Sequence, residues 1–346
     1  MVVTRILDEV SELPKLDLKD RKIIGLLVNN CRLTFSELAK KVMLSRDAVR
    51  YRINRMQELG VIQKFTILSK YSLFDYKHFK VYLQIVELES SKEKELFDYL
   101  KKNPNFLNII EYSDKWELEL AVYSKTVDEF DEVLNDFLTK FSDLVENMEI
   151  FHVIKNYSYV NIPREFVKQK IEEPPEIENL DKPKKHKELG QDDIKLDETD
   201  RNLMNLLAKN GRESLYALAE KLSVSADTVN YRIKKLVDKG VIQQFSTIIN
   251  WSLIGYQFYT LFLNMKYMTK EDEMKFKQLV RMHPNIVRAM KTMGDYNIVL
   301  KVVARNQKGF HDTIRKIRLE FKDRVKNYDT LISYREQKFE VFASLL

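Results

Sequence analysis

The chain has 346 residues, of which 44% are hydrophobic and 32% are charged, a composition typical of a folded globular protein with room for two or more domains. The formal net charge of +6 is compatible with a polyanionic partner but does not require one. Because Cys31 is the only cysteine, the sequence excludes disulfides within the chain and a cysteine-based metal cluster.

The sequence contains no apolar run of the roughly 18 residues that indicate a transmembrane helix. The amino-terminal residues MVVTRILDEVSELPK hold no apolar core long enough for a signal peptide. We therefore expect a cytoplasmic protein with no membrane partner.

The strongest pattern is an internal repeat with an offset of 180 residues. The segment that begins at Leu16 aligns without a gap on the segment that begins at Leu196. About 25 of the 61 positions from Leu16 to Tyr76 are identical to their partners, and further along the chain Pro104 still aligns with Pro284. The sequence therefore predicts one module used twice.

The first part of each module predicts three helices. Asp17 followed by Asp20 is typical of a capping pair that opens a helix, and a short second helix carries Leu38 and Ala39. The stretch up to Ser45 is long enough only for a tight turn, so the second and third helices form a helix-turn-helix. After Gly60 in the first copy and Gly240 in the second, β-branched and aromatic residues predict a small hairpin or wing.

The third helix, from Ser45 to Gly60 and again from Ser225 to Gly240, is amphipathic. Its apolar residues recur at steps of three and four, and the opposite face is basic, amide-bearing and aromatic. Such a face suits the DNA major groove, because it offers donors to base edges and cations to phosphates; an ordinary solvated helix face is the alternative. The expected DNA-binding residues are Ser45, Arg46, Asp47, Arg50, Tyr51, Arg52, Asn54 and Arg55 in the first copy, and Ser225, Asp227, Asn230, Tyr231, Arg232, Lys234 and Lys235 in the second.

Two positions in this set allow sharper hypotheses. Arg52 and Arg232 lie about 60° from the apolar stripe, so we interpret them as phosphate clamps or as helix-packing residues. Arg50 aligns with Asn230, and arginine favours guanine whereas asparagine favours adenine. The sequence therefore predicts an asymmetric operator whose half-sites lie about one helical turn, roughly 34 Å, or a multiple of it apart.

The second part of each module alternates strand and helix patterns in the order βαββαβ, which is the ferredoxin-like plan. The first copy predicts strands over 79–88, 107–112, 116–122 and 148–159 and helices over 92–101 and 126–139. Such a sheet has helices on one face, so its other face needs a partner, which the second copy can supply. The fold class is thus α+β, with two copies of a winged helix-turn-helix followed by a ferredoxin-like domain.

The predicted domains follow from these patterns. The winged helix-turn-helix domains are 16–75 and 196–255, and the ferredoxin-like domains are 76–162 and 256–346. The segment 163–195 is dense in Lys, Glu and Pro, which predicts a charged, extended or disordered linker. Its roughly 33 residues give a coil with a reach on the order of 30 Å, which is enough for the modules to pair.

These residues resemble the Lrp/AsnC (leucine-responsive/asparagine-type, feast/famine) transcription regulators. The matching positions are Leu16, Asp17, Asp20, Arg21, Leu38, Ala39, Ser45, Arg52, Ile53, Gly60, Val61 and Ile62, with their copies from Leu196 to Ile242. The βαββαβ part resembles the family's effector-sensing and dimer-forming domain. The family is typically a single module that dimerises, so the resemblance implies a sequence-specific DNA-binding regulator built as an intramolecular pseudo-dimer.

The resemblance also implies a small-molecule effector, such as an amino acid, held near a glycine-containing turn between the second and third strands. Gly294, Asp295, Tyr296 and Asn297 match that turn, whereas the first module has Asp114-Lys115-Trp116-Glu117. A turn that merely connects two strands is the alternative, because a hairpin glycine needs no ligand to explain it. Pairing of two such chains is left open.

The predicted fold is compatible with two other functions. Siroheme decarboxylases resemble this same fold, but the histidines (His78, His152, His186, His283 and His311) neither cluster nor recur in register. No phosphate-binding loop, metal-ligand spacing or nucleophile-base pair occurs, so we expect no enzyme activity, no cofactor and no metal. A non-specific DNA-architectural protein is the second alternative, and the modest net charge argues against it.

Overall fold

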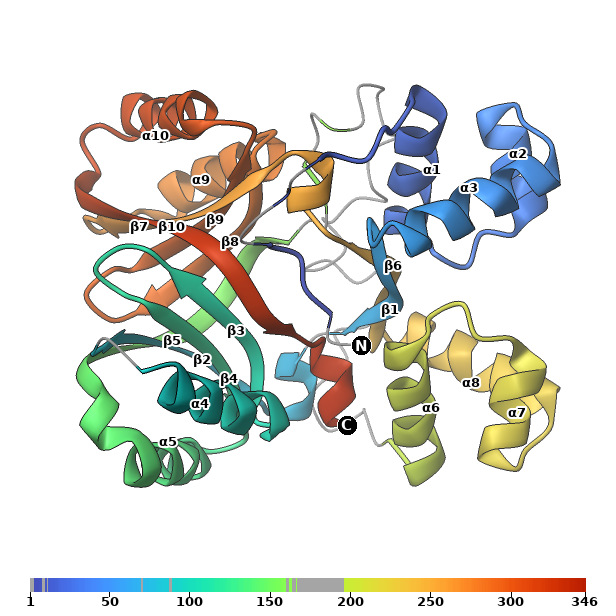
Figure 1. The fold of residues 1–346 in the computed structure, drawn as a ribbon, viewed down its shortest axis with the longest axis horizontal. Helices are drawn as coiled ribbons and strands as arrows, with labels where there is room; N and C mark the ends of the chain where they lie inside the picture. Colours follow the sequence, from blue (N-terminus) through green and yellow to red (C-terminus); the bar gives the residue numbers. More distant parts are fainter. Residues whose placement is uncertain are drawn as a thin grey trace. The chain divides into compact units, whose positions relative to one another are not determined.

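The computed structural model describes residues 3–7, 10, 12–69, 71–86, 89–159, 162–163, 166 and 196–346. Apart from Pro163 and Phe166, the predicted linker 163–195 lies outside the described residues. The chain forms two units, and each unit takes equivalent parts from both modules (Figure 1). The head unit comprises Lys15–Tyr76, Val167–Ile249 and Glu340–Leu346, and the barrel unit comprises Met1–Pro14, Lys77–Phe166 and Asn250–Phe339.

The head unit contains two three-helix heads, one from each module. The first head consists of α1 (Leu18–Asn29), α2 (Phe35–Val42) and α3 (Arg46–Glu58). The second head consists of α6 (Glu198–Lys209), α7 (Leu215–Leu222) and α8 (Ala226–Asp238). Each helix begins where a capping side chain accepts an otherwise unpaired backbone N–H. The capping residues are Asp17, Thr34, Ser45, Asp197, Ser214 and Ser225.

The strands that follow the heads pair with each other. β1 (Ile62–Ser69) and β6 (Ile242–Ile249) form an antiparallel two-stranded ribbon between the two modules. The prediction of a small hairpin after each head is therefore wrong, because each strand finds its hydrogen-bonding partner in the other module. Figure 1 shows this ribbon between the two heads.

The heads also exchange contacts across the ribbon. α1 packs on β6, and α6 packs on β1. Arg32 donates to the backbone carbonyls of Gly211 (3.1 Å) and Glu213 (3.2 Å), and Arg212 donates in return to the carbonyl of Leu33 (3.1 Å). These reciprocal bonds tie each head to the other module by the same geometry.

Short 3-10 helices complete the head unit. Tyr71–Phe74 follows β1, and Phe342–Leu345 lies near the carboxyl end of the chain. The ring of Phe342 packs against the rings of Tyr71, Phe74 and Tyr76 with centroid distances of 6.2, 5.7 and 5.0 Å. The end of the second module is thus fastened to the segment that leaves the first head.

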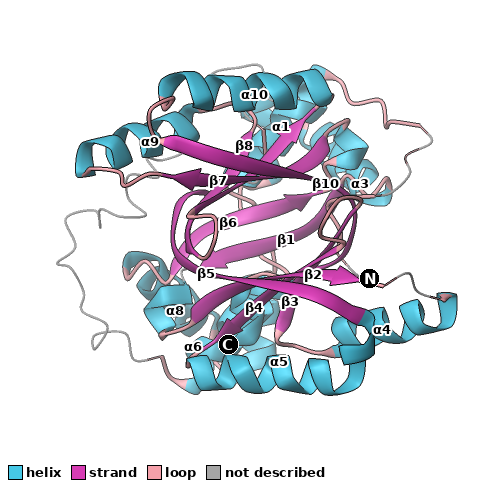
Figure 2. Ribbon diagram, turned by 90° about the vertical axis from the view of Figure 1, so that its left-hand side faces the viewer, coloured by secondary structure: helices cyan, strands magenta, loops and turns pink. Residues whose placement is uncertain are grey.

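The described part of the barrel unit holds eight antiparallel strands. They are β2 (Lys77–Ile85), β3 (Phe106–Tyr112), β4 (Leu118–Ser124), β5 (Val145–Tyr159), β7 (Gln257–Met265), β8 (Ile286–Met293), β9 (Ile298–Ala304) and β10 (Val325–Phe339). Within each module the strand order is ferredoxin-like, β3-β4-β2-β5 and β8-β9-β7-β10. Pairing of β5 with β8 and of β10 with β3 closes the two sheets into one barrel (Figure 2). The predicted α+β fold class is confirmed.

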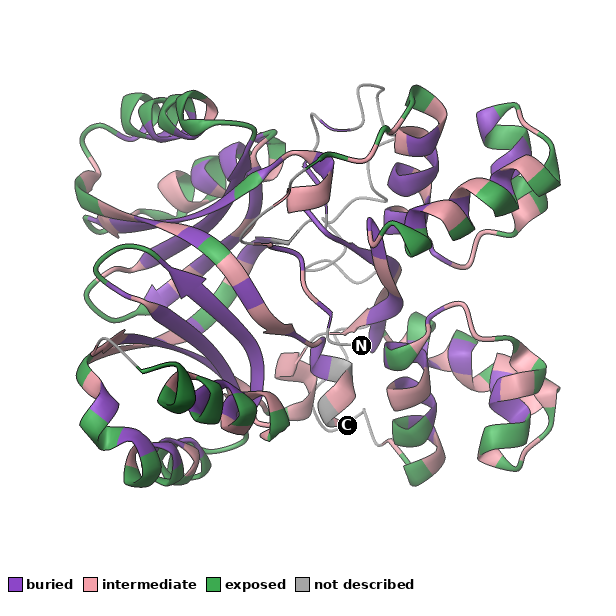
Figure 3. Cartoon of the chain, viewed as in Figure 1, coloured by how far each residue is buried: buried purple, intermediate pink, exposed green. Residues whose placement is uncertain are grey.

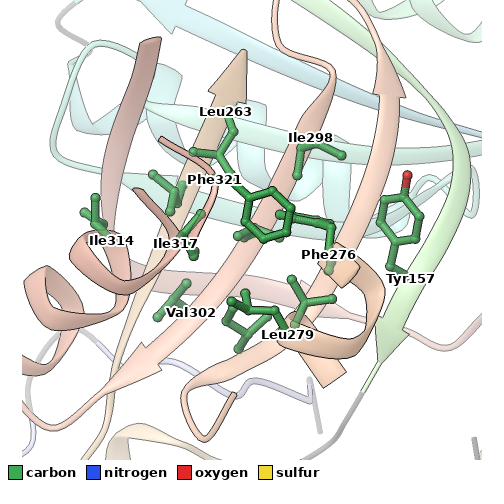
Figure 4. Close-up of a cluster of buried hydrophobic side chains, with 14 of the residues drawn as sticks. Tyr157, Leu263, Phe276, Leu279, Ile298, Val302, Ile314, Ile317 and Phe321 are labelled. Carbon is green, nitrogen blue, oxygen red and sulfur yellow. The ribbon is translucent and has the colours of Figure 1, made fainter. Parts of the chain in front are cut away.

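Two pairs of helices cover opposite sides of this barrel (Figures 1 and 2). α4 (Ser90–Lys102) and α5 (Val127–Phe141) belong to the first module, and α9 (Lys270–Met282) and α10 (Gln307–Glu320) to the second. Short 3-10 helices lie at Ser142–Leu144 and Ser252–Ile254. Figure 4 shows one of the resulting cores, in which Phe276 and Leu279 of α9 and Ile314 and Ile317 of α10 pack with Phe321 and the strand residues Leu263, Ile298 and Val302.

The barrel strands alternate between these helix-facing cores and the barrel interior. On β2, Val81 and Leu83 belong to the core under α4 and α5, so the residues between them point inward. The inward set contains buried polar groups, of which Lys80 is 1% exposed and Glu119 is fully buried. Figure 3 shows the barrel strands as mostly buried. The interior of the barrel is therefore a closed but partly charged space.

Three charged groups meet inside the barrel. The Lys80 ammonium lies 2.5 Å from Glu119 Oε1, and the Lys301 ammonium contacts the other oxygen, Glu119 Oε2. Tyr112 donates its hydroxyl to the same carboxylate at 2.6 Å, and Lys301 also donates to the hydroxyl of Thr260 at 2.8 Å. Because burial disfavours charge, a single carboxylate shared by two lysines leaves excess positive charge in the interior.

No helix among the described residues is long and apolar enough to cross a membrane.

Burial makes the stability of the barrel depend on pH. Desolvation, opposed by the Glu119 carboxylate, lowers the pKa of Lys301 to about 7, whereas a lysine in the unfolded chain titrates at roughly 10.4. Between these two values the unfolded chain holds a proton that the folded chain has lost, so stability increases as the pH rises. We expect Lys301→Met to remove this increase, measured as the urea midpoint from pH 7 to pH 10.

The matched control is Lys322→Met, because Lys322 is an exposed lysine of the same unit and its loss changes the net charge equally. This variant should keep the wild-type pH profile. Parallel profiles for wild type and Lys301→Met would contradict the assignment.

Candidate nucleic-acid interface

The third helix of each head is fixed by one cap and one apolar stripe. Ser45 accepts the backbone N–H of Ala48 at 3.1 Å, and Ser225 accepts that of Thr228 at the same distance. The stripe residues of α3 are buried in the first head, and those of α8 are buried in the second. They are Val49, Ile53 and Met56 in α3 and Val229, Ile233 and Leu236 in α8.

The opposite face of both helices is open to solvent. The predicted DNA-binding residues that are exposed are Ser45, Arg46, Asp47, Arg50, Tyr51 and Asn54 in the first head, and Ser225, Asp227, Tyr231 and Lys234 in the second. Those of intermediate exposure are Arg52, Arg55, Asn230, Arg232 and Lys235. Each of the two helices therefore carries its predicted residues on its own polar face. The serines Ser45 and Ser225 also cap the helices.

Tyrosine stands at the same place on both exposed faces. Tyr51 is 69% exposed and Tyr231 is 68% exposed, which is unusual for so large an apolar ring. Two further exposed apolar side chains differ between the heads. Met43 ends α2 in the first head, and Tyr216 lies in the first turn of α7 in the second. The two heads thus share a central aromatic residue but differ beside it.

Arg52 holds its helix to the start of the first helix. Its Nη1 atom lies 2.7 Å from a carboxylate oxygen of Asp17 and 2.7 Å from one of Asp20. Asp20 is 1% exposed and also accepts from Arg55 at 3.5 Å. Arg55 in addition donates to the carbonyl of Lys15 at 2.7 Å. Of the two interpretations of Arg52, helix packing is the one its contacts support.

The second head repeats this clamp with Lys235 in place of Arg55. Arg232 Nη1 lies 2.7 Å from Asp197 and 2.7 Å from Asp200, and Lys235 reaches Asp200 at 3.5 Å. The hydrogen bond from Arg232, followed by that from the backbone N–H of Asp200, lowers the pKa of the Asp197 carboxyl. The angle at which each recognition helix leaves its head is therefore set by an aspartate pair.

The turn between β8 and β9 is a tight structure within the barrel unit. Gly294 has a φ of 152°, and a Cβ atom there would lie 2.6 Å from the Phe151 ring of β5, which belongs to the first module. The Asn297 side chain accepts the N–H of Met265 at 2.9 Å and donates to its carbonyl at 2.7 Å. Thr292 donates to the carbonyl of Tyr296 at 2.7 Å. Glycine is thus required by a close approach between modules.

The equivalent turn of the first module is built differently. Asp114, in the place of Gly294, accepts the backbone N–H of Ile332 at 2.6 Å. Trp116 is 4% exposed, and Glu117 accepts the N–H of Ile85 at 3.0 Å. The carboxylate of Asp114 is therefore engaged by the second module. Asp295, by contrast, is exposed. Burial raises the pKa of the Glu149 carboxyl, and the negative charge of Asp295 raises that pKa further.

The described residues contain no group of three or more His, Cys, Asp or Glu side chains placed to hold a metal ion. His186 lies outside the described residues.

The sequence patterns missed two features. The aspartate pairs were interpreted only as helix caps, although the recurrence of both aspartates together with Arg52 and Arg232 at the same spacing could have indicated the clamp. The charged group inside the barrel left no such signal. Lys80 aligns with Thr260 and Lys301 with Ala121, so neither lysine recurs between the modules.

The comparisons with known proteins agree with this geometry. An AsnC-type helix-turn-helix model matches residues 16–57, a winged helix-turn-helix DNA-binding model matches 196–243, and the Lrp/AsnC ligand binding domain matches 260–340. The models thus match two helix-turn-helix domains and one ligand-binding domain.

The chain belongs to the Lrp/AsnC family of transcriptional regulators. It is similar to the HTH-type transcriptional regulator FL11 of Pyrococcus furiosus, with 32% identity over 32% of this chain and 72% of the relative. It is equally similar to the FL11 regulator of Pyrococcus abyssi, with 32% identity over 36% of this chain and 83% of the relative. Each relative therefore matches little more than a third of the chain, as expected when one of two modules is aligned.

Among solved structures, the siroheme decarboxylase NirDL in co-complex with an iron-uroporphyrin III analogue has a TM-score of 0.59. The identity is 14%, and the alignment covers 93% of this chain and 92% of that chain. A second structure of NirDL has a TM-score of 0.58 and 13% identity. At these identities the similarity shows a common fold over nearly the whole chain.

The clamp in the second head predicts a loss of stability. Asp200→Asn removes the carboxylate charge that Arg232 and Lys235 share, and a hydrogen bond to a charged group contributes roughly 1.5–3 kcal/mol. We expect the head unit to lose stability by about this amount, measured as faster hydrogen exchange in α8. Asp238→Asn removes an exposed charge at the end of the same helix and should leave exchange unchanged. Equal exchange in the two variants would show that the clamp is dispensable.

Proposed function

We propose that the chain is a transcription regulator that binds double-stranded DNA through the exposed faces of α3 and α8, and that it does so in the cytoplasm. The observation that carries the proposal is that each helix buries one apolar stripe and turns a polar face with cationic residues to solvent. Such a face can donate to base edges and to phosphates in the major groove. Membership of a family of helix-turn-helix regulators supports the same function.

The basic residues of the two helices fall into two groups, those that are exposed and those that are paired with aspartates. Arg46 and Arg50 are exposed in α3, and Lys234 is exposed in α8, so these cations are available to DNA. Arg52 and Arg232 are committed to aspartates, so their contribution is to orient the helix. We expect substitutions of the exposed cations to change DNA affinity more than they change stability.

We further propose that the two modules act as an intramolecular pseudo-dimer. Within the head unit, the β1–β6 ribbon and the reciprocal bonds of Arg32 and Arg212 join the heads. Both recognition helices therefore belong to one unit, as the two subunits of a helix-turn-helix dimer would present them. Half-sites about one helical turn, roughly 34 Å, or a multiple of it apart fit this arrangement.

The two recognition helices are chemically different. Arg50 stands where the second head has Asn230, and Asn54 stands where it has Lys234. Arginine pairs with the O6 and N7 atoms of guanine, and asparagine with the N6 and N7 atoms of adenine. The proposed operator is accordingly asymmetric, with one half-site for each head.

The test is selection of bound fragments from random DNA with the full-length protein at physiological salt. We expect enrichment of two unlike half-sites at a fixed spacing. Arg50→Asn should alter one half-site only, with a change in binding free energy of roughly 1–3 kcal/mol at that base pair, and Asn230→Arg should alter the other. Lys322→Asn is the matched control, because it removes an exposed cation of the barrel unit.

Each other outcome contradicts a defined part of the proposal. A symmetric motif would contradict the assignment of two different heads. Binding without an enriched motif would favour a DNA-architectural protein. If no DNA is bound, the regulator hypothesis fails, and titration with a tetrapyrrole, followed by its absorption spectrum, tests the siroheme-decarboxylase alternative.

We also propose that the turn Gly294–Asn297 takes part in binding a small effector such as an amino acid. The turn packs against β5 of the other module, and its Asp295 carboxylate and Tyr296 ring stand beside that contact. The first module offers no equal site, because Asp114 is bonded to the second module and Trp116 is buried.

A substitution at Gly294 distinguishes the hypothesis that the turn binds a ligand from the alternative that it only connects two strands. Gly294→Ala places a methyl group 2.6 Å from Phe151, so the turn must move. We expect the variant to lose the rise in melting temperature that the effective amino acid gives the wild type. Gly309→Ala, whose added methyl group meets its nearest neighbour at an ordinary 3.5 Å, should keep that rise. If no amino acid in a full panel shifts the melting temperature of the wild type, the turn only connects strands.

A further inference from the structure

The helices α5 and α10, which cover opposite sides of the barrel, carry opposite net charge (Figures 1 and 2). α5 of the first module holds five acidic residues and one basic residue. α10, the equivalent helix of the second module, holds four basic residues and two acidic residues. The other pair of equivalent helices shows no such contrast, because α4 and α9 each hold four basic and three acidic residues. The difference is therefore confined to α5 and α10.

At three aligned positions of these two helices the charge is reversed outright. All of the residues concerned are exposed to solvent. Within the part of the chain that the structure describes, none of them forms an ion pair. The reversed pairs are Asp128 with Lys308, Asp136 with Lys316, and Lys140 with Glu320.

The helix dipole explains only part of this pattern. The dipole favours acids in the first turn, where α5 has Asp128 and Glu129. Glu132 and Asp136 follow Asp128 at steps of four residues, and like charges at that spacing destabilise a helix. Lys308 lies near the start of α10, where the dipole disfavours a cation. A partner of opposite charge on each helix would offset these repulsions.

Each helix thus presents one charged surface to solvent. The acidic surface of α5 comprises Asp128, Glu132 and Asp136, and the basic surface of α10 comprises Lys308, Arg315 and Lys316. We propose that the acidic surface of one chain binds the basic surface of a second copy of this chain. A second copy accounts for both surfaces, whereas DNA would account only for the basic one. Contact between two α5 helices, or between two α10 helices, would bring like charges together and is disfavoured.

The placement of the two surfaces determines the kind of assembly. They lie on opposite sides of one barrel, so a chain that binds one copy through its acidic surface still offers its basic surface to another. A contact between unlike surfaces adds chains until a ring closes or a filament grows. Exposed ion pairs contribute little each and are screened by salt, so low salt and high protein concentration favour assembly. The association does not depend on whether the chain binds DNA.

The experiment is sedimentation velocity of the full-length protein without DNA, over a range of protein concentrations. Charges interact over about 30 Å at roughly 0.01 M salt and over about 3 Å at roughly 1 M salt. At the lower salt we expect the weight-average sedimentation coefficient to rise with concentration beyond the value for two chains. At the higher salt it should return to the value for one chain. A wild-type protein that remains a single chain at low salt, stops at two chains or stays assembled at high salt would overturn the proposal.

Two charge-reversed variants assign the contact to these helices. Asp128→Lys with Asp136→Lys makes the α5 surface basic, and Lys308→Asp with Lys316→Asp makes the α10 surface acidic. Each variant alone should remain a single chain, because its two surfaces then carry like charge. An equimolar mixture should assemble again, because one variant supplies basic surfaces and the other acidic ones. Assembly of either variant alone, or a mixture that stays unassembled, contradicts the assignment; if a variant does not fold, the salt dependence of the wild type decides.

The matched control is Glu58→Lys with Asp238→Lys. These exposed acids end α3 and α8 in the head unit, and their replacement changes the net charge as much as the α5 variant does. The control should assemble as the wild type does, and its failure to assemble would show that net charge alone governs association. If the wild type remains a single chain and Lys308→Asp with Lys316→Asp weakens DNA binding, the proposal fails and the basic surface is a DNA contact instead.

Discussion

Backbone pairing between the two modules is the constraint on which the rest of the structure depends. A ferredoxin-like sheet with helices on one face leaves its other face and its outer strands without partners. Here β5 pairs with β8 and β10 with β3, so each sheet supplies the edges that the other lacks. In the head unit, β1 and β6 likewise pair with each other through backbone hydrogen bonds. Neither module completes its own strand pairing, either in the barrel unit or in the head unit.

Pairing of unlike copies also permits the copies to diverge. The clamps of Asp20 and Asp200 are kept in both heads, because each recognition helix must be held at the same angle. The residues that face solvent are free to differ, as Arg50 and Asn230 do. A symmetric dimer of identical subunits cannot change one half of its surface alone. A tandem chain can, and Arg50 and Asn230 are such a difference.

The sequence allowed the local structure and the pairing of the two modules to be predicted, but not which strands of the modules pair. Caps such as Ser45 and stripes such as Val49, Ile53 and Met56 are local signals, so the helices of the heads were predictable. The strand after Gly60 was assigned to a hairpin because its partner, β6, lies 180 residues away and leaves no local trace. The interior lysines were missed for the same reason, since period-two alternation on β2 and β9 does not reveal which strands will face each other.

The carboxylate inside the barrel has a consequence for assembly. Glu119 belongs to the first module, and the second module has Val299 at that position. Two second modules brought together would bury two copies of Lys301 without the Glu119 carboxylate, and an uncompensated buried ion costs several kcal/mol. The unlike pair places Lys301 on Glu119 instead. The buried charge therefore disfavours the pairing of two second modules.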